Sequence, residues 1–168
     1  DDAYNKNKLM GMIQSKKEDN SVYKIGCLGR INDYQKSKDG RIFINLTGIT
    51  RFQILEEIKN DKLYREFKVN YKIFEIDLFE KKEEFNSSSL IEKSKKFFNK
   101  SGLLLNWKEL EKLDYIQKIN TLAMISPITS EEKQKLLETI SLEEKAKTLE
   151  NIISFYLHAV NFNSQTIQ

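Results

Sequence analysis

The chain has 168 residues, of which 39% are hydrophobic and 32% are charged, and its 28 Lys and Arg residues against 25 Asp and Glu residues give a net charge of +3. This length and this content of Ile, Leu, Phe and Tyr are typical of a folded chain and exclude a disordered one. The nearly balanced charge, with no basic run, argues against a nucleic-acid-binding module, and the short apolar runs exclude a membrane-spanning helix.

Cysteine usage indicates the compartment. Cys27 is the only cysteine, so the chain can form neither an internal disulfide nor a cysteine cluster for zinc. The chain does not open with a basic segment followed by an apolar one, which a secretory signal would require. We therefore expect a cytoplasmic protein that does not contact membranes.

The hydrophobic period changes along the chain. Residues 1–85 carry five of the six glycines and a strand-like alternation, whereas a helical period begins at Asn86. The polar segment 80–89 ends in three serines and is the predicted hinge. We expect a β-rich domain over residues 1–85 and a helical domain over residues 86–168.

The first half predicts antiparallel strands. Lys38-Asp39-Gly40 is a hairpin signal, because Asp-Gly accepts the positive φ angles of a tight turn, and alternating apolar residues follow over 42–46. Gly48 allows a bulge or a sharp bend. In the segment 67–78 the apolar residues move from odd to even positions, which a β-bulge inside one strand would explain. These patterns predict a strongly curved antiparallel sheet or a small barrel.

The second half predicts helices. Apolar stripes indicate one helix through residues 90–98 and a second through residues 110–119, which stops before Pro127. The final helix has the most regular stripe, from Leu149 to Val160. Two capping boxes predict where the last two helices begin: Thr129 with Glu132, and Ser141 with Glu144.

The residue types needed for catalysis are not grouped in the sequence. The single histidine, His158, lies in the last predicted helix, and Cys27 lies in an apolar strand where a buried thiol is usually inert. The sequence contains no phosphate loop, no complete dinucleotide fingerprint and no nucleophile elbow. We expect a protein that is not an enzyme and that uses no metal or cofactor.

Segment 64–72, in which aromatic and basic residues alternate, is the place in the sequence to look for nucleic-acid binding. A stacking surface needs aromatic and basic side chains on one exposed face. Strand alternation instead places Phe67 and Tyr71 on one face and Lys68 and Lys72 on the other. The pattern favours aromatic residues in a core.

Several segments resemble the substrate-binding domain of the ATP-dependent protease Lon. That family has a glycine-containing strand that ends near Arg-Ile, then a hairpin, then a strand that closes with Gly-x-x-Arg-Phe. The matching residues here are Gly26, Gly29, Arg30-Ile31, Gly48 and Arg51-Phe52. The segments Pro127–Leu137 and Ser141–Lys145 are similar to the helical end of the same domain. The resemblance covers most of the chain.

The resemblance implies an α+β fold, with a curved antiparallel sheet of the pseudo-barrel, PUA-like type followed by a helical bundle. The family also occurs as stand-alone proteins in bacteria. Because neither an ATPase module nor a Ser–Lys dyad follows Gln168, we expect a stand-alone protein or an excised domain. Family members open with a strand that leads into a helix, and Asp1–Ala3 is similar to the end of that helix, so we expect this strand to precede Asp1.

The function that the resemblance implies is non-catalytic recognition of unfolded or damaged polypeptide, and the expected partners are unfolded polypeptides or a protease or chaperone. RNA binding, by analogy with PUA-like folds, is the alternative. Peptide sites often combine aromatic contacts with an exposed sheet edge. Candidate polypeptide-binding residues near the hairpin are Arg30, Tyr34, Arg41 and Phe43.

Two questions about these residues stay open in the sequence. Phe43 could instead pack beneath the helices or the missing strand. The family-motif residues have structural explanations: we expect the glycines to allow bends, Phe52 to lie in the core and Arg51 to pair with a carboxylate. The glycines concerned are Gly26, Gly29 and Gly48.

Overall fold

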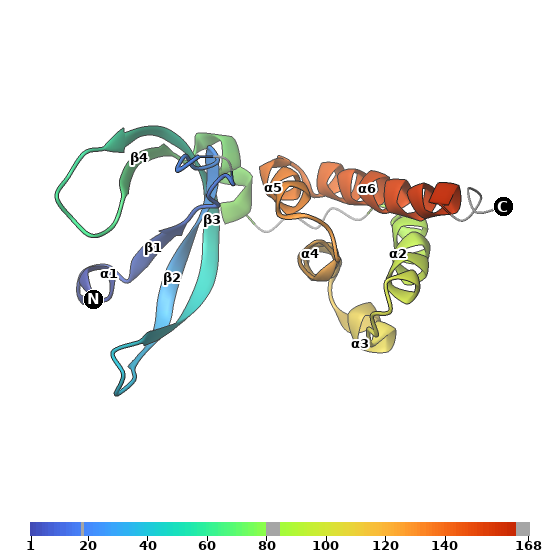
Figure 1. Cartoon of the computed structure of the whole chain (residues 1–168), viewed down its shortest axis with the longest axis horizontal. Coiled ribbons are helices and arrows are strands. Elements are labelled where there is room, and N and C mark those ends of the chain that lie inside the picture. Colours follow the sequence, from blue (N-terminus) through green and yellow to red (C-terminus); the bar gives the residue numbers. More distant parts are fainter. Residues whose placement is uncertain (18, 80–84, 164–168) are drawn as a thin grey trace. The chain divides into compact units, whose positions relative to one another are not determined.

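The structure, a computed structural model, describes residues 1–17, 19–79 and 85–163. It divides into two compact units, Asp1–Lys81 and Lys82–Gln168 (Figure 1). The first unit contains the sheet and the second contains helices. The predicted hinge, 80–89, falls partly on residues 80–84, which lie outside the described residues.

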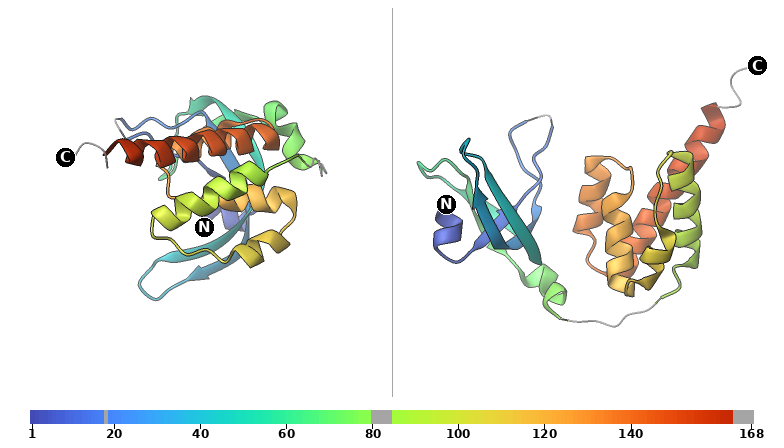
Figure 2. Two further views of the ribbon diagram at one scale, coloured as in Figure 1. Left: turned by 90° about the vertical axis from the view of Figure 1, so that its right-hand side faces the viewer. Right: turned by 90° about the horizontal axis from the view of Figure 1, so that it is seen from below.

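Four antiparallel strands form one sheet in the order β1-β2-β3-β4. Their bounds are β1 Leu9–Met12, β2 Ile25–Lys36, β3 Ile42–Ile58 and β4 Glu66–Asn70. Register shifts interrupt both the β2–β3 and the β3–β4 pairing, and such bulges bend a sheet (Figure 2). Over the described residues the sheet is open, with β1 and β4 at its edges. The predicted curved antiparallel sheet of an α+β fold is confirmed, and it is not a closed barrel.

The turn between β2 and β3 is the predicted hairpin. Gly40 has a φ of +85°, a conformation that glycine adopts without steric cost. The Gly40 N–H donates to the Ser37 carbonyl, 3.1 Å away, and the Ser37 N–H donates to the Arg41 carbonyl at 2.9 Å. Asp39 accepts hydrogen bonds from Ser37 and Arg41. The turn is therefore fastened by its own polar side chains.

The predicted bulged strand over 67–78 is wrong. β4 ends at Asn70, and a 3-10 helix, η1 (Lys72–Leu78), follows. The element is kinked at Phe74, whose φ of −115° and ψ of 22° are not helical, and both Phe74 and Asp77 contact β3. Phe74 is buried, its carbonyl accepts from the Thr50 hydroxyl at 3.4 Å, and Asp77 bonds Arg51. The change of phase in the sequence marks a strand-to-helix change.

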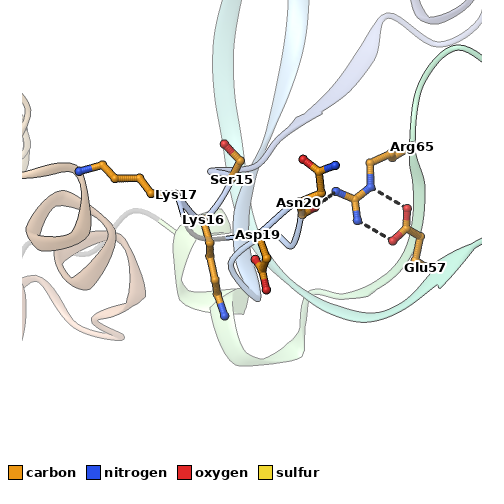
Figure 3. A pocket seen from close by; sticks show the side chains of 7 residues that line it. All are labelled: Ser15, Lys16, Lys17, Asp19, Asn20, Glu57 and Arg65. Atoms are coloured by element: carbon orange, nitrogen blue, oxygen red, sulfur yellow. Dashed lines mark hydrogen bonds and ion pairs between the residues drawn. The ribbon is translucent and has the colours of Figure 1, made fainter.

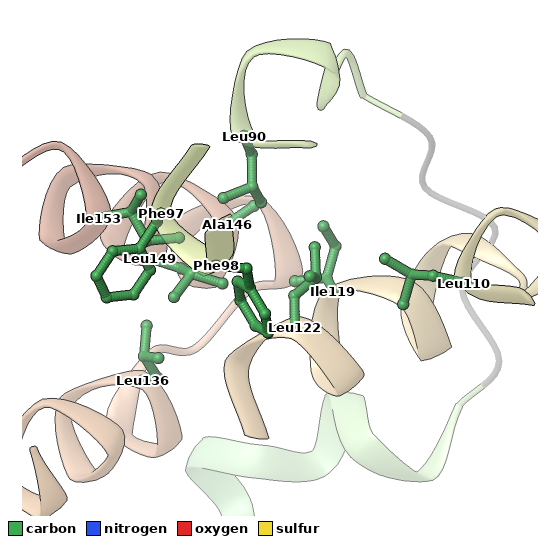
Figure 4. Packing of buried hydrophobic residues seen from close by; sticks show 10 residues of the cluster. All are labelled: Leu90, Phe97, Phe98, Leu110, Ile119, Leu122, Leu136, Ala146, Leu149 and Ile153. Carbon is green, nitrogen blue, oxygen red and sulfur yellow. The ribbon is translucent and has the colours of Figure 1, made fainter. Parts of the chain in front are cut away.

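The second unit is a bundle with one hydrophobic core. Its helices are α2 Ser88–Lys100, α3 Trp107–Lys112, α4 Tyr115–Ile125, α5 Ser130–Glu138 and α6 Leu142–Asn163. Buried side chains from all five helices meet (Figure 4): Leu90, Phe97, Phe98, Leu110, Ile119, Leu122, Leu136, Ala146, Leu149 and Ile153. Val160, the end of the predicted stripe, belongs to α6, but its side chain lies outside the described part.

The starts of the last two helices follow the predicted capping boxes. Thr129 accepts from the Glu132 N–H at 3.2 Å while the Glu132 carboxylate accepts from the Thr129 N–H at 2.8 Å. The second box differs in one bond: Ser141 accepts from the Glu144 N–H at 3.1 Å, but the Glu144 carboxylate accepts from the Ile140 N–H at 3.0 Å. Both pairs satisfy N–H groups that a helix start leaves open.

The predicted single helix through residues 110–119 is also wrong, because two helices occupy this region. α3 ends at Lys112 and α4 begins at Tyr115. Between them, the Asp114 carboxylate accepts from the Gln117 N–H at 2.8 Å and caps α4. A capping side chain favours a new helix start over continuation. In the sequence, Asp114 three residues before Gln117 is the capping signal for this helix start.

A short helix, α1 (Asp2–Asn5), precedes β1. Within the described residues, no helix is both long and apolar enough to span a membrane.

Candidate functional site

The β2–β3 hairpin extends beyond the two outer strands. β1 pairs with β2 only over Cys27–Arg30, and β4 pairs with β3 only over Gln53–Ile58. Residues 31–48 therefore form a two-stranded projection, which we call the arm (Figure 1). No third strand pairs with the arm among the residues that the structure describes.

Three consecutive apolar side chains are exposed near the tip of the arm. The exposed fractions are 42% for Ile42, 56% for Phe43 and 37% for Ile44. Ile44 lies opposite Tyr34 and Phe43 lies opposite Gln35. Because successive side chains of a strand point to opposite faces, Ile42 and Ile44 share the face of Tyr34, and Phe43 stands on the other face. The arm tip thus presents apolar groups on both of its faces.

The four predicted binding residues do not gather on one surface. Arg30 is exposed and lies opposite Thr47, so it shares the face of Phe43 but stands about 13 Å farther along the strand. Tyr34 belongs to the opposite face. Arg41 is committed to the turn, because its guanidinium lies 2.6 Å from the Asp39 carboxylate. Of the four, Phe43 is the exposed apolar side chain, at 56% exposure.

The Arg41–Asp39 pair lowers the pKa of the Asp39 carboxylate. Hydrogen bonds from the side chains of Arg41 and Ser37, and from the Arg41 N–H, lower the pKa of Asp39 to about 2. Asp39 is therefore charged at neutral pH and compensates the charge of Arg41 at the tip of the arm.

Tyr34 holds α1 against its face of the arm. Its ring stacks on Tyr4, with ring centroids 4.5 Å apart and an interplanar angle of 23°, and its hydroxyl donates to Asp1. The Tyr64 hydroxyl donates to the Asp2 carboxylate of the same helix at 2.9 Å, a bond that raises the pKa of Tyr64. Tyr34 therefore has a structural partner. Sequence reasoning missed it because these contacts join residues far apart in the chain.

The family-motif residues Gly26 and Phe52 pack against each other. A Cβ atom on Gly26 would lie 2.7 Å from Cζ of Phe52 and 2.7 Å from the Met12 carbonyl oxygen. Phe52 is 3% exposed. At Gly29 and Gly48, added Cβ atoms would meet their neighbours at the ordinary distances of 3.5 Å and 3.7 Å. Close contact with neighbouring atoms therefore explains why position 26 is a glycine better than it explains the glycines at positions 29 and 48.

Arg51 fastens η1 to the sheet. Its N–H and its Nε both donate to Oδ2 of Asp77 at 2.9 Å, and Nη2 donates to Oδ1 at 2.7 Å. The guanidinium carbon lies 4.3 Å from the ring centroid of Phe74. The Arg51 and Asp77 side chains are only 10% and 20% exposed, so water screens this pair weakly. These contacts are those of a structural residue.

A polar hollow of about 680 Å³ lies where the loop after β1 meets the β3–β4 hairpin (Figure 3). The Arg65 guanidinium donates to both carboxylate oxygens of Glu57 at 2.6 Å and to the Asn20 carbonyl at 2.9 Å. The hydrogen bonds from Arg65 lower the pKa of Glu57. Asp19 accepts from the Ser21 N–H. Arg65 thus joins Glu57 of β3 to Asn20 of the loop after β1, so these contacts make the hollow a junction between loops.

The other candidate chemistry is not assembled into a site. Among the described residues, no three His, Cys, Asp or Glu side chains are placed to hold a metal ion. His158 is exposed, and its Nδ1 lies 2.6 Å from the Ser154 carbonyl oxygen. Cys27 is half-buried, and its thiol lies 3.7 Å from the Leu28 carbonyl oxygen. In the aromatic and basic segment, Lys68 pairs with Glu56 at 3.2 Å.

Comparison with known proteins connects this geometry to a family. The family model for the substrate-binding domain of the ATP-dependent protease La (LON) matches residues 1–154. A comparison with curated proteins finds no match. The chain is similar to the solved structure of a Lon N-terminal domain protein from Xanthomonas campestris, with 16% identity, coverage of 88% of this chain and 78% of that chain, and a TM-score of 0.64.

A second similar structure is the N-terminal domain of the Lon protease of the Mycobacterium avium complex. It has 16% identity and a TM-score of 0.55, and the match covers 86% of this chain and 77% of that one. At such identity the likeness shows the fold alone, whereas the family model spans most of the sequence. The chain belongs to the family of LON substrate-binding domains.

Proposed function

We propose that this protein binds unfolded or damaged polypeptide through the apolar tip of the arm, without catalysing a reaction on it. Membership in a family of substrate-binding domains supports substrate recognition in general. The observation that carries the proposal is the exposure of Ile42, Phe43 and Ile44 at the end of a projecting hairpin. Neighbouring exposed apolar side chains mark contact sites more often than scattered ones do.

The arm tip is mainly apolar, with Lys36 as a charged neighbour opposite Ile42. Phe43 lies opposite Gln35, and Arg41 is compensated by Asp39. Full burial of an exposed apolar side chain is worth about 2 kcal/mol. Because these three are 37–56% exposed and lie on two faces, each contributes less, and the contact is a weak one that many unfolded chains can make. A protease or chaperone that receives the bound chain is the partner that this role implies.

The test is a fluorescence anisotropy titration with labelled, reduced and carboxymethylated α-lactalbumin at about 50 and about 500 mM NaCl. We expect saturable binding at both salt concentrations, which Phe43→Ala weakens about tenfold. The thermal midpoint should stay nearly unchanged, because the Phe43 side chain is 56% exposed.

Phe155→Ala is the matched control. Phe155 is 68% exposed and lies on α6, in the other unit, so its removal should leave binding intact. Equal binding by wild type and Phe43→Ala would contradict the proposal. Binding that disappears at the higher salt concentration would show that charge, and not apolar contact, holds the unfolded protein, and would also contradict the proposal. A large loss of stability in Phe43→Ala would place this side chain in the core.

A further inference from the structure

We propose that the bound polypeptide adds as an extended strand to the outer edge of β3, between Ile42 and Gly48. This inference rests on the proposed function and specifies how the arm holds its ligand. The apolar side chains at the tip are then one part of the site. The backbone of β3 is the other part.

The register of the hairpin sets which backbone groups of β3 face outward. In an antiparallel pair, hydrogen-bonded residue pairs alternate with pairs whose N–H and C=O groups point away from the partner strand. The Ser37 N–H bonds the Arg41 carbonyl at 2.9 Å, so the next pair, Lys36 with Ile42, is of the second kind. By alternation, so is the pair of Tyr34 with Ile44.

A second hydrogen bond gives the same register from the other end of the arm. Leu46 lies opposite Ile31, whose N–H donates to the Lys8 carbonyl at 2.7 Å, away from β3. The pair of Ile31 with Leu46 is therefore also of the outward kind. The N–H and C=O groups of Ile42, Ile44 and Leu46 thus form a row along the outer edge of β3.

This row is accessible over the part of β3 that forms the arm. β4 covers β3 from Gln53 onward, and η1 contacts it at Thr50 and Arg51. Between 42 and 48 every residue is exposed except Leu46, which is half-buried. Within the described residues, no strand pairs with this stretch on its outer side.

Along this stretch β3 carries neither the charges nor the proline that usually prevent strand pairing, and register shifts interrupt its pairing with β2. Proteins protect exposed edges with lysine, proline, inward charges or very short strands. Residues 42–50, Ile-Phe-Ile-Asn-Leu-Thr-Gly-Ile-Thr, contain neither a charge nor a proline. By contrast, the five-residue edge strand β4 carries Lys68 at its centre. An open, uncharged edge is what recognition by strand addition requires.

The chemistry of the edge defines the ligand. A partner for a row of alternating backbone groups must itself be extended, so it contains no proline within the paired stretch. About six to seven residues would span the edge, at roughly 3.3 Å per residue. Because residues 42–50 are uncharged and largely apolar, we infer an uncharged segment rich in β-branched or aromatic residues. Such segments are strands in native sheets and become exposed on unfolding.

The decisive variants differ in the outward N–H of residue 44, which proline lacks and alanine keeps. Ile44→Pro removes the outward N–H, while the inward bonds of Phe43 and Asn45 to β2 are kept. Ile44→Ala removes most of the same side chain but keeps the N–H. With the labelled octapeptide Thr-Val-Asn-Val-Thr-Ile-Gln-Thr as probe, we expect Ile44→Pro to bind at least about tenfold more weakly than Ile44→Ala. The thermal midpoints of the two variants show whether both fold.

Equal affinities of the two variants would overturn strand addition and leave the proposed function standing, because side chains alone would then hold the peptide. If the wild type binds neither the octapeptide nor the unfolded protein, both proposals fail. If the wild type binds the unfolded protein but not the octapeptide, strand addition alone is overturned.

Amide hydrogen exchange on the wild type tests the same inference without a substitution. Saturating octapeptide should slow exchange about tenfold or more at Ile42, Ile44 and Leu46, and leave Phe43 and Asn45, which already bond β2, unchanged. Uniform slowing, or none, would overturn the inference. Two copies can also pair in this register, with Asn45 opposite Asn45. If exchange at these residues slows without peptide as the protein concentration rises, a second copy binds the edge, and the inference is overturned.

Discussion

At the scale of single residues, Gly26 shows how one missing side chain permits the sheet to form. A Cβ atom there would lie 2.7 Å from the Met12 carbonyl oxygen, 2.7 Å from Cζ of Phe52 and 2.9 Å from Cγ1 of Ile13. Backbone and buried ring cannot both yield, so we expect Gly26→Ala to lower the free energy of unfolding by about 2 kcal/mol. Chemical denaturation followed by circular dichroism would measure it.

Gly48→Ala is the control for this substitution. Its added Cβ would lie 3.7 Å from Sγ of Cys27, an ordinary contact, so its effect should stay within about 0.5 kcal/mol. Positive φ angles among the glycines occur only at Gly40 and Gly102, so backbone conformation does not distinguish the two test positions. Similar losses in both variants would show that space beside Gly26 is not the cause.

The sequence predicts individual residues well where their role depends on near neighbours. Strand alternation correctly separates Phe43 from Ile42 and Ile44. It does not reveal that Tyr34 stacks on Tyr4 beneath α1, or that Asp77 is the partner of Arg51. Those contacts depend on how distant segments pack, which no local pattern encodes.

At the scale of elements, α2 carries a buried hydroxyl that its surroundings do not satisfy. Ser94 is 0% exposed, and its Oγ has no hydrogen-bond partner among the described residues. Leaving a buried polar group without a partner costs free energy that alanine would not incur. We expect Ser94→Ala to raise the free energy of unfolding by about 1 kcal/mol, measured by chemical denaturation.

Ser126→Ala is the control for Ser94→Ala, because the Ser126 hydroxyl has a partner. Ser126 is also 0% exposed, but its hydroxyl donates to the Leu122 carbonyl at 2.7 Å. Its replacement should therefore be neutral or destabilising. Stabilisation by both substitutions would show that removing any buried hydroxyl helps here, whether or not it is bonded.

The elements that the sequence predicts correctly have a long, regular period or a capping signal. The hairpin of β2 and β3 and the start of α5 are of this kind. The segment 67–78 misleads because its apolar residues keep a strand-like alternation at 74, 76 and 78, although β4 ends at Asn70 and a 3-10 helix follows. The second helix misleads because its stripe continues through Leu113 although Asp114 starts a new helix. In both places a local hydrogen bond from a backbone N–H to a side chain marks the start of a helix: Lys72 donates to the Asn70 side chain at 3.0 Å, and Gln117 donates to Asp114 at 2.8 Å.

At the scale of the whole molecule, each unit has a hydrophobic interior of its own. In the first unit the buried apolar residues are Ile31, Phe52 and Phe74, and in the second the helices share one cluster. The change of hydrophobic period along the sequence follows from this difference, because strands and helices expose apolar faces at different spacings. Separate interiors make separate unfolding possible.

We propose that the two units, Asp1–Lys81 and Lys82–Gln168, unfold as separate cooperative transitions in differential scanning calorimetry. Asp77→Ala leaves the Arg51 side chain, which is 10% exposed, without its carboxylate and should destabilise the first unit by about 3 kcal/mol. Ser94→Ala should stabilise the second unit. If each substitution shifts a different transition, stability is local to each interior. A single transition that both substitutions shift would mean that the chain unfolds as one cooperative unit, and a substitution in the helices would then change the stability of the arm.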